Sequence, residues 1–445
     1  MHHRLSLILL SLLLLLIAVS ATAQPVLLIS IDGLRPCDVL DTKTRHLKLP
    51  NLTAFLHEGS YARGVRGVLP TLTYPSHTTL LTGVSPAQHG IGGNLSFDPF
   101  GKNQYGWMWY AADIRSPTLW DAAHAAGLST ANVHWPVSVG AKVDWNLPQI
   151  WRAHTDDDRK LLAALATPGL LPTLEHELGP YAAGGAEDTE ADVNRVRFAA
   201  KLLADKQPEF MTVYLAALDH IEHLEGPGTP VTDAVLERLD ALIGELIKTA
   251  RRVHPDGVIA VVSDHGFASV TQDVNLYAPF IAEGLIEVKD GAVADWRAMP
   301  WNDGGSAAIV LRDPADGATR KKVAALLSKL AADPAYGIDR VLDRAQVAAL
   351  GGTELAEWFV LLKPGYELAT RLDAPMLAPS RYKGMHGYDP ALAQMYSAFL
   401  IKGPGIPVGR DLGVVDMRDI APTLAARLGF ALPQAQGHDI LAPAP

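Results

Sequence analysis

Acidic and imidazole side chains follow several apolar segments of this 445-residue chain at the point where each segment ends. Asp32 follows "LLISI", Asp219 follows "YLAAL", and the adjacent Asp264 and His265 follow "IAVVS". An aspartate at the end of a single strand is usually a turn or capping residue. In open α/β sheets, however, ligands collect outside the carboxyl ends of the strands. Four such residues after three apolar segments therefore indicate one shared polar site.

Local spacing extends this set. In "LDHIEHLEG", Asp219 and His223 are four residues apart, so one helical turn places both side chains on the same face. Gly266 permits the turn that lets the Asp-His pair before it reach a common site. His386 in "MHGYDP" belongs to no apolar pattern. Each of these histidines, taken alone, is more simply explained as an ordinary surface or core histidine.

The stretch "PTLTYPSHTTLLTG", residues 70–83, places hydroxyl and histidine side chains at the start of a helix predicted at 75–83. Ser and Thr commonly cap the free N–H groups of a first helical turn, and Pro is favoured at the first helical position. The same helix start can also hold a phosphate at its positive end, beside a hydroxyl nucleophile. The stretch by itself leaves both explanations open.

The combined set points to metal chemistry. It contains three aspartates, three histidines and one threonine, and the single cysteine of the chain, Cys37, excludes an intramolecular disulfide. Oxygen and nitrogen donors of this kind suit a pair of zinc ions. Two metals about 3.5–4 Å apart can stabilise both oxygens of an in-line phosphoryl displacement. The pattern therefore favours a two-zinc site that acts on phosphate esters.

Alternating apolar and amphipathic segments must position these residues. Strand-like runs lie at 25–32, 129–135, 209–219 and 256–266, and helical patterns lie at 51–59, 118–127, 190–206 and 232–253. This alternation predicts an α/β fold, in which helices flank a mostly parallel sheet on both faces. Between 276 and 380 the pattern loosens into short strands around a helix, which predicts a smaller inserted α+β subdomain.

Four parts of the chain are predicted: a signal peptide at 1–23, the first part of the catalytic core at 24–275, the inserted subdomain at 276–380, and the C-terminal part of the core at 381–445. Basic residues, an apolar run from Leu5 to Val19 and "ATA" at 21–23 are typical of a secretory signal. We therefore expect a periplasmic or secreted protein with no transmembrane span after signal cleavage. The formal net charge of −10 argues against a nucleic-acid scaffold.

A resemblance to a known family is carried by six motifs that occur in order along the chain. They are "ISIDGLRP", "PTLTYPSHTTLLTG", "HGIGGN", "DHIEHLEGP", "SDHGF" and "HGYDP". Together they resemble the nucleotide pyrophosphatase/phosphodiesterase family of the alkaline phosphatase superfamily, over residues 25 to 435. The resemblance implies an alkaline-phosphatase-like fold and two zinc ions per chain. It also implies hydrolysis of phosphodiester or phosphoanhydride bonds through a phospho-threonine intermediate.

The resemblance further implies roles for individual residues. Thr73 corresponds to the nucleophile, which leaves Thr71 structural, and Asn94 corresponds to the residue that holds a phosphate oxygen. Tyr74 corresponds to an aromatic residue that binds substrate, and its N–H is expected to face the phosphate. The implied metal ligands are Asp32, Thr73, Asp264 and His265 for the first zinc, and Asp219, His223 and His386 for the second.

Sulfatases and phosphomonoesterases, whose architecture is similar, carry sequence motifs that can be looked for in this chain. Sulfatases need a C-x-P-x-R context, which Cys37 in "PCDVL" does not provide. Phosphomonoesterases with a threonine nucleophile carry a Lys-x-Arg pair that grips the extra phosphate charge. Trp135 and Pro136 stand where that pair would be, which favours a diester. A phosphomonoesterase and a non-catalytic zinc-dependent binding protein are the alternatives.

We expect the substrate to be a small phosphodiester, and its class stays open between nucleotides and lipid or choline-type headgroups. Tyr74 can stack on a nucleobase or simply pack against the helix start. The aromatic-rich segments 103–114 and 148–154 are candidates for the rest of a pocket.

Overall fold

A computed structural model of the protein describes residues 23–103, 106–181 and 185–443. All but the last residue of the predicted signal peptide lies outside these residues. A central sheet is formed by β1 (Val26–Ile31), β2 (Ser60–Tyr61), β4 (Thr130–Val133), β5 (Trp145–Leu147), β6 (Phe210–Leu215), β7 (Val258–Val262), β18 (Phe399–Lys402) and β19 (Arg410–Asp411). The strand order is β19-β2-β18-β7-β1-β6-β4-β5.

The centre of this sheet is parallel. β1 pairs in parallel with β6 and β7, and β4 pairs in parallel with β6 and β5, whereas β18 runs antiparallel to β7. The residues of β1, β6 and β7 are all buried, as expected for strands covered on both faces. Ile31 at the end of β1 is level with Leu215 at the end of β6. The carboxyl ends of the central strands therefore meet at one edge.

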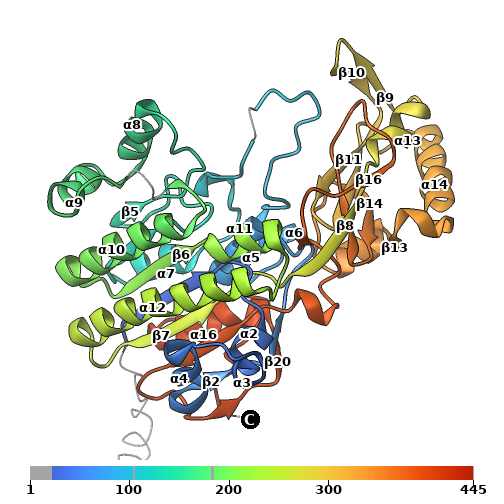
Figure 1. Cartoon of the computed structure of the whole chain (residues 1–445). Helices are drawn as coiled ribbons and strands as arrows, with labels where there is room; N and C mark the ends of the chain where they lie inside the picture. The colour runs from blue at the N-terminus through green and yellow to red at the C-terminus, as the bar shows by residue number, and fades with distance from the viewer. Residues whose placement is uncertain (1–22, 104–105, 182–184, 444–445) are drawn as a thin grey trace, which may run out of the picture.

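Helices cover both faces of the sheet (Figure 1). Along β1, Leu27 and Ile29 pack into one hydrophobic cluster, and Val26 and Leu28 pack into another, because successive side chains point to opposite faces. The first cluster includes residues of α4 (Pro50–Glu58), α10 (Thr189–Lys206) and α12 (Pro230–Val253). The second includes residues of α5 (Thr73–Thr82), α7 (Leu119–Ala125) and α16 (Ile420–Arg427). The predicted α/β architecture is confirmed.

Shorter elements complete this part of the molecule. They are α2 (Pro36–Leu40), α3 (Thr42–Arg45), α6 (Pro86–His89), α8 (Asp156–Leu165), α9 (Leu170–Leu178), α11 (Ala217–Glu225), the 3₁₀ turns η1 (Ala111–Asp113), η4 (Ala393–Met395) and η5 (Met417–Asp419), and the parallel strand pair β3 (Gly64–Arg66) and β20 (Val414–Asp416).

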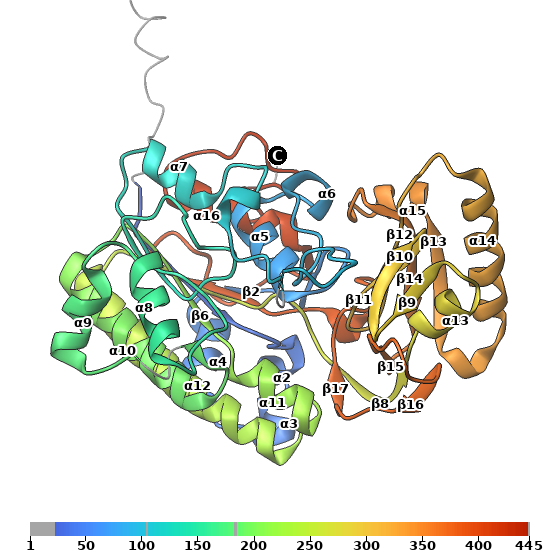
Figure 2. The same ribbon diagram turned by 90° about the horizontal axis from the view of Figure 1, so that it is seen from above.

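A second, antiparallel sheet lies beside the first (Figure 2). It consists of β11 (Ala298–Asp303), β12 (Ser306–Leu311), β14 (Ala356–Leu362) and β13 (Ile338–Asp343), in that order. It is accompanied by α13 (Tyr277–Ala282), α14 (Gly317–Ala332), the 3₁₀ turn η3 (Pro334–Tyr336), α15 (Arg344–Ala349) and the hairpin of β9 (Ile286–Lys289) and β10 (Ala292–Trp296). A cluster of buried apolar side chains separate from those of the central sheet forms its core.

Strands near the predicted domain boundaries join the two parts. β8 (Ala268–Val274) pairs with β15 (Gly365–Leu368), β16 (Leu377–Pro379) and β17 (Gly384–Met385). Figure 2 shows β8 and β17 passing between the two sheets. The division at 275/276 and 380/381 stays a prediction. Within the described residues, no helix combines the length and the apolar character needed to cross a bilayer.

Candidate active site and metal centre

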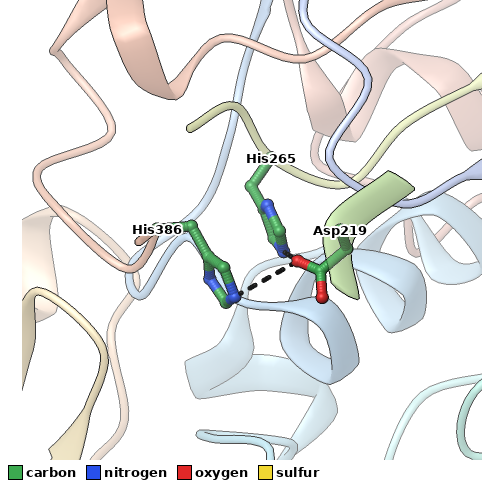
Figure 3. Close-up of side chains that lie close together, drawn as sticks. All are labelled: Asp219, His265 and His386. Carbon is green, nitrogen blue, oxygen red and sulfur yellow. Dashed lines mark ion pairs between the residues drawn. The ribbon is translucent and has the colours of Figure 1, made fainter. Parts of the chain in front are cut away.

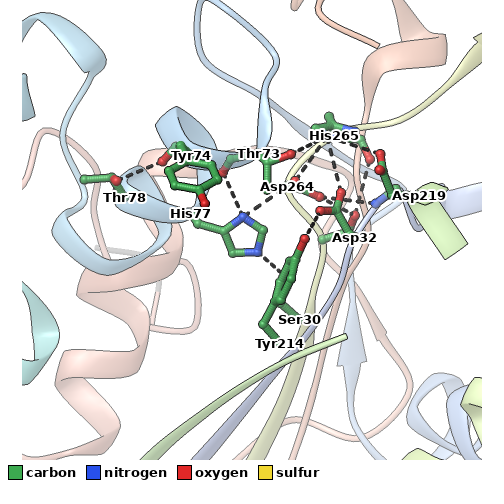
Figure 4. Close-up of polar contacts among 12 residues, drawn as sticks. Ser30, Asp32, Thr73, Tyr74, His77, Thr78, Tyr214, Asp219, Asp264 and His265 are labelled. Atoms are coloured by element: carbon green, nitrogen blue, oxygen red, sulfur yellow. Dashed lines mark hydrogen bonds and ion pairs between the residues drawn. The ribbon is translucent and has the colours of Figure 1, made fainter. Parts of the chain in front are cut away.

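The predicted ligands converge at the carboxyl ends of three adjacent strands. Asp32 follows β1, Asp219 lies in the first turn of α11 after β6, and Asp264 and His265 follow β7. Because β7, β1 and β6 are neighbours in the sheet, their ends deliver these side chains to one place (Figure 4). His223 lies in the last turn of the same helix as Asp219, as the four-residue spacing predicts.

One group of side chains is centred on His265. Its Nε2 atom lies 3.3 Å from Asp32 Oδ1 and 3.1 Å from Asp264 Oδ2. The Thr73 hydroxyl oxygen lies 3.4 Å from the same nitrogen. Thr73 is the first residue of α5, so the hydroxyl stands at the positive end of a ten-residue helix, within reach of this group.

A second group is centred on Asp219 (Figure 3). Asp219 Oδ1 lies 3.6 Å from His386 Nε2 and 4.0 Å from His265 Nε2, and Asp219 Oδ2 lies 3.5 Å from His223 Nε2. The rings of His265 and His386 stack, with centroids 3.7 Å apart. His386 follows β17 directly, so the pairing of β17 with β8 brings this distant residue to the site.

Each of the three candidate histidine ligands has its Nδ1 atom beside a backbone carbonyl. Nδ1 of His223 donates to the Gly384 carbonyl, Nδ1 of His265 to the Gly266 carbonyl, and Nδ1 of His386 to the Thr71 carbonyl, at 3.0, 3.2 and 3.2 Å. A carbonyl can only accept, so each Nδ1 carries the proton. The Nε2 lone pairs are therefore left for a cation, in the arrangement usual for metal-binding histidines.

Each candidate aspartate ligand has one buried oxygen that lacks a hydrogen-bond donor among the described residues. Among the described residues, none donates a hydrogen bond to the buried atoms Asp32 Oδ1, Asp219 Oδ1 and Asp264 Oδ2. Buried polar atoms are normally satisfied, so three unpartnered carboxylate oxygens at one place need an explanation. Two groups of three residues bring their ligand atoms close together. Within each group the ligand atoms lie within 4.8 Å of one another, and the groups are Asp32-Asp264-His265 and Asp219-His265-His386. Divalent cations between these groups would satisfy all three oxygens.

Burial disfavours the charged forms of Asp32, Asp219 and the three histidines. It raises the pKa of Asp32 well above its usual value, with further repulsion from Asp264 and Asp219, and it raises the pKa of Asp219 likewise. Burial also lowers the pKa of His223 to about 4 and the pKa values of His265 and His386. Neutral imidazoles beside carboxylates form a nitrogen and oxygen donor set that fits zinc.

Other side chains hold these ligands in place. Tyr214, the next-to-last residue of β6, donates its hydroxyl to Asp32 Oδ2, and the Gly33 N–H donates to Asp264 Oδ1 at 3.2 Å. His77, one turn along α5, lies 2.8 Å from both the Ser30 hydroxyl and the Thr73 carbonyl. These contacts fix Asp32, Asp264 and the first turn of α5 relative to one another.

The start of α5 is not capped by its hydroxyl residues. The N-cap is Leu72, which has no side-chain cap, and Thr73 begins the helix two residues earlier than the expected start at 75. The Thr71 hydroxyl donates to the Tyr388 carbonyl at 2.8 Å, so it caps no N–H group of the helix. Thr78 donates to the Tyr74 carbonyl, four residues back. Of the two explanations for this stretch, the structure therefore does not support capping.

Asn94 and Tyr74 are joined to each other. The Tyr74 N–H, expected to face the phosphate, donates to Asn94 Oδ1 at 2.9 Å. The Tyr74 ring is fully buried, lies 5.3 Å from the Trp107 ring, and donates its hydroxyl to Gln149 Oε1 at 2.5 Å. In this conformation the ring packs against its neighbours and shows no free face for a nucleobase.

A cavity of about 330 Å³ opens onto these residues. Thr73, Asn94 and candidate metal ligands line it, together with Trp107 and Trp151 from the two aromatic-rich segments. The lining also includes Glu187 and Tyr382. Among the described residues of the lining there is no lysine or arginine.

Sequence reasoning missed several residues at this site, including Tyr382 and the three described next. Tyr214 lies inside an apolar strand, Glu187 precedes α10, and Asp303 accepts the Asn94 N–H at 3.0 Å from the end of β11. The "DGG" at 303–305 does signal a tight hairpin. Nothing in that local signal says which distant segment the hairpin meets.

Comparison with known protein families matches residues 26–389 to the family described as type I phosphodiesterase / nucleotide pyrophosphatase. This match covers most of the chain, which belongs to that family of hydrolases within the alkaline-phosphatase-like superfamily.

Relatives with curated descriptions are similar over about half of the chain. Human ectonucleotide pyrophosphatase/phosphodiesterase family member 1 is 26% identical over 254 residues, 54% of this chain and 23% of that protein. Venom phosphodiesterase of Naja atra is 25% identical over 258 residues, 56% of this chain and 27% of that protein. The chain thus spans about a quarter of the length of these relatives.

Solved structures are similar over nearly the whole chain. Human ectonucleotide pyrophosphatase/phosphodiesterase 5 matches with a TM-score of 0.67 and 20% identity, over 93% of this chain and 97% of that one. The murine protein, in an inactive form in complex with AMP, matches with a TM-score of 0.68 and 20% identity, over the same shares. At this identity the likeness shows the shared fold.

Proposed function

We propose that the chain is an exported two-zinc phosphodiesterase/nucleotide pyrophosphatase that works through a phospho-threonine intermediate on Thr73. One observation carries the proposal. Three Nε2 lone pairs and three unpartnered carboxylate oxygens gather beside a hydroxyl at the N-terminus of α5. The family membership of the chain supports the same reaction class.

The seven predicted ligands divide between two ions in this proposal. The first set is Asp32, Thr73, Asp264 and His265, and the second is Asp219, His223 and His386. His265 also lies near Asp219, so the two sets are contiguous. Zinc held by these residues would lower the pKa of the Thr73 hydroxyl and would offset negative charge on the phosphoryl oxygens.

The chain's own residues then carry out the exchange of bonds. The Thr73 hydroxyl gives up its proton to solvent, and its oxygen forms a bond to phosphorus. The bond from phosphorus to the leaving oxygen breaks at the same time, and the leaving group departs with that electron pair and takes up a proton from solvent where it needs one. Asn94 donates its amide NH2 to a non-bridging oxygen, and the N-terminus of α5 favours the negative charge that accumulates there. Water then attacks phosphorus, and the bond from phosphorus to the Thr73 oxygen breaks. That oxygen regains a proton, so Thr73 is restored and the phosphate monoester product leaves.

Diesters fit the charge of the cavity better than monoesters. A monoester dianion needs an additional cationic partner, and no lysine or arginine lines the described part of the cavity. Trp135 and Val137, which stand where a Lys-x-Arg pair would be, are both buried and uncharged, so neither supplies that partner. Trp107, Trp151 and Tyr382 supply aromatic walls for the second ester group.

We infer that the substrates are nucleotides, with lipid or choline-type diesters as the open alternative. The murine structural relative was solved in complex with AMP, and the matched relatives are described as nucleotide pyrophosphatases/phosphodiesterases. Export is inferred from the signal pattern at 1–23, and relatives described as ectoenzymes and venom enzymes support it.

Parallel kinetics on matched esters test the proposal. We expect kcat/KM for bis(p-nitrophenyl) phosphate to exceed that for p-nitrophenyl phosphate by at least about tenfold, or about 1.4 kcal/mol of transition-state binding. Hydrolysis of ATP and of the p-nitrophenyl ester of thymidine 5′-monophosphate is measured alongside, together with zinc content. A faster reaction with the monoester, or turnover by zinc-free protein, would contradict the proposal.

A further inference from the structure

Asn94 is held by three segments that are distant from one another in the sequence. Its backbone N–H donates to Asp303 Oδ2 at 3.0 Å, and its carbonyl accepts from the Met108 N–H at 3.0 Å. Its side-chain Oδ1 accepts from the Tyr74 N–H at 2.9 Å. Since Oδ1 is the acceptor, the NH2 group is the part of the amide that remains to donate to a substrate oxygen.

Asp303 approaches Asn94 from the antiparallel sheet. It is the last residue of β11, and residues 303–305, named here the hairpin tip, turn the chain into β12. The approach is close, because a Cβ atom on Gly93 would lie 2.9 Å from Asp303 Oδ2. Burial raises the pKa of the Asp303 carboxyl to about 7, and the bond from the Asn94 N–H favours its charged form. In that form the bond is charge-assisted and about twice as strong as a neutral one.

The same hairpin tip also meets the backbone of His386. The Gly305 N–H donates to the His386 carbonyl at 2.9 Å. Gly304 has a φ of +59°, and a Cβ atom there would lie 2.4 Å from the His386 carbonyl oxygen. The tip is therefore seated between the segment that bears Asn94 and the segment that bears a candidate metal ligand.

We propose that Asp303 is a positioning residue: its carboxylate holds the Asn94 backbone so that the Asn94 amide meets a phosphate oxygen beside Thr73. Asp303 is not among the described residues that line the cavity, so it acts through Asn94. Small displacements are costly in such an arrangement, because misplacing a reacting partner by about 1 Å can cost about 100-fold in rate. This inference rests on the proposed function.

A double-mutant cycle on the full-length, zinc-loaded protein tests the inference. Steady-state kinetics with bis(p-nitrophenyl) phosphate are measured for the wild type, Asp303→Ala, Asn94→Ala and the double variant. We expect Asp303→Ala to lower kcat/KM about 10- to 100-fold, mainly through kcat. We expect the double variant to lie within about twofold of Asn94→Ala, because the carboxylate has no effect once the amide is gone.

Two further variants separate positioning from general support of the fold. Asp303→Asn keeps an oxygen that can accept the Asn94 N–H, so it should stay within about threefold of the wild type. Asp303→Ser places its hydroxyl too far back to reach Asn94, and it takes the place of the alanine variant in the cycle if that variant folds poorly. Asp295→Ala, which removes an exposed carboxylate from the neighbouring strand β10, is the matched control and should retain full activity.

The results of these experiments distinguish failure of the inference about Asp303 from failure of the proposed function. An equal loss from Asp303→Ala in the presence and absence of Asn94 would overturn the inference, as would an Asp303→Ala activity within twofold of the wild type. A wild type that hydrolyses no diester would instead overturn the proposed function, and this inference with it.

Discussion

His89 is a buried histidine whose neutral form is specified by its two partners. It ends α6, has no exposed surface, and its Nδ1 lies 3.1 Å from the Ile91 N–H, from which it must accept. Its Nε2 lies 3.1 Å from the Thr79 hydroxyl, which in turn donates to the Val84 carbonyl. A proton on Nδ1 would face the Ile91 N–H, so the folded protein resists protonation of this ring.

The expected consequence is a loss of stability in acid. Burial lowers the pKa of His89 from 6.5 to about 3, so between these values the unfolded chain holds a proton that the folded chain does not. Stability therefore falls as the pH falls, by about 1.4 kcal/mol per unit for one such group. Between about pH 6.5 and about pH 4.5, protonation of His89 in the unfolded chain should lower the free energy of unfolding of the wild type by about 2–3 kcal/mol.

His89→Asn isolates this contribution. The Asn oxygen can still accept the Ile91 N–H, while the bond to Thr79 is lost, so the variant should be about 1–2 kcal/mol less stable near neutral pH. Because it no longer titrates, its deficit should vanish or reverse at about pH 4.5. Groups that titrate in both proteins cancel in the comparison.

Urea unfolding followed by tryptophan fluorescence, at several values between about pH 7.5 and about pH 4.5, measures this difference directly. The same substitution at His124, an exposed histidine on α7, controls for the change of residue type. A difference between the wild type and His89→Asn that stays constant within about 0.5 kcal/mol over this range would refute the reasoning.

Other predictions concern the site itself. Thr73→Ala should lower kcat at least about 1,000-fold and keep its zinc, whereas Thr71→Ala, which loses only the bond to the Tyr388 carbonyl, should retain activity within severalfold. Equal losses in the two variants would show that the nucleophile is misassigned. His386→Ala should purify with about one zinc per chain by elemental analysis, because the second site loses a ligand first. Chelation should abolish hydrolysis and added zinc should restore it; activity that survives exhaustive dialysis against chelator would refute a metal mechanism.

Local patterns in the sequence were enough to predict the architecture and the candidate ligands. The runs that became β1, β6 and β7 are mostly apolar, as is typical of buried parallel strands, and each is followed by acidic or imidazole residues. The carboxyl ends of neighbouring parallel strands lie at the same edge of a sheet. Residues that follow such strands are therefore expected to lie close together. For this reason Asp32, Asp219, Asp264 and His265 could be grouped before any coordinates were known.

Tertiary structure decided how the site is held. Asp303 is 209 residues from Asn94, and His386 is 315 residues from Thr71, whose carbonyl orients it. The Tyr74 N–H was expected to face a phosphate, yet it is occupied by Asn94. These hydrogen-bond partners are distant in the sequence. They meet only because the antiparallel sheet and β17 pack against the central sheet. A local pattern fixes the residue type and the face of an element, but the acceptor that each donor meets depends on which distant segment packs there.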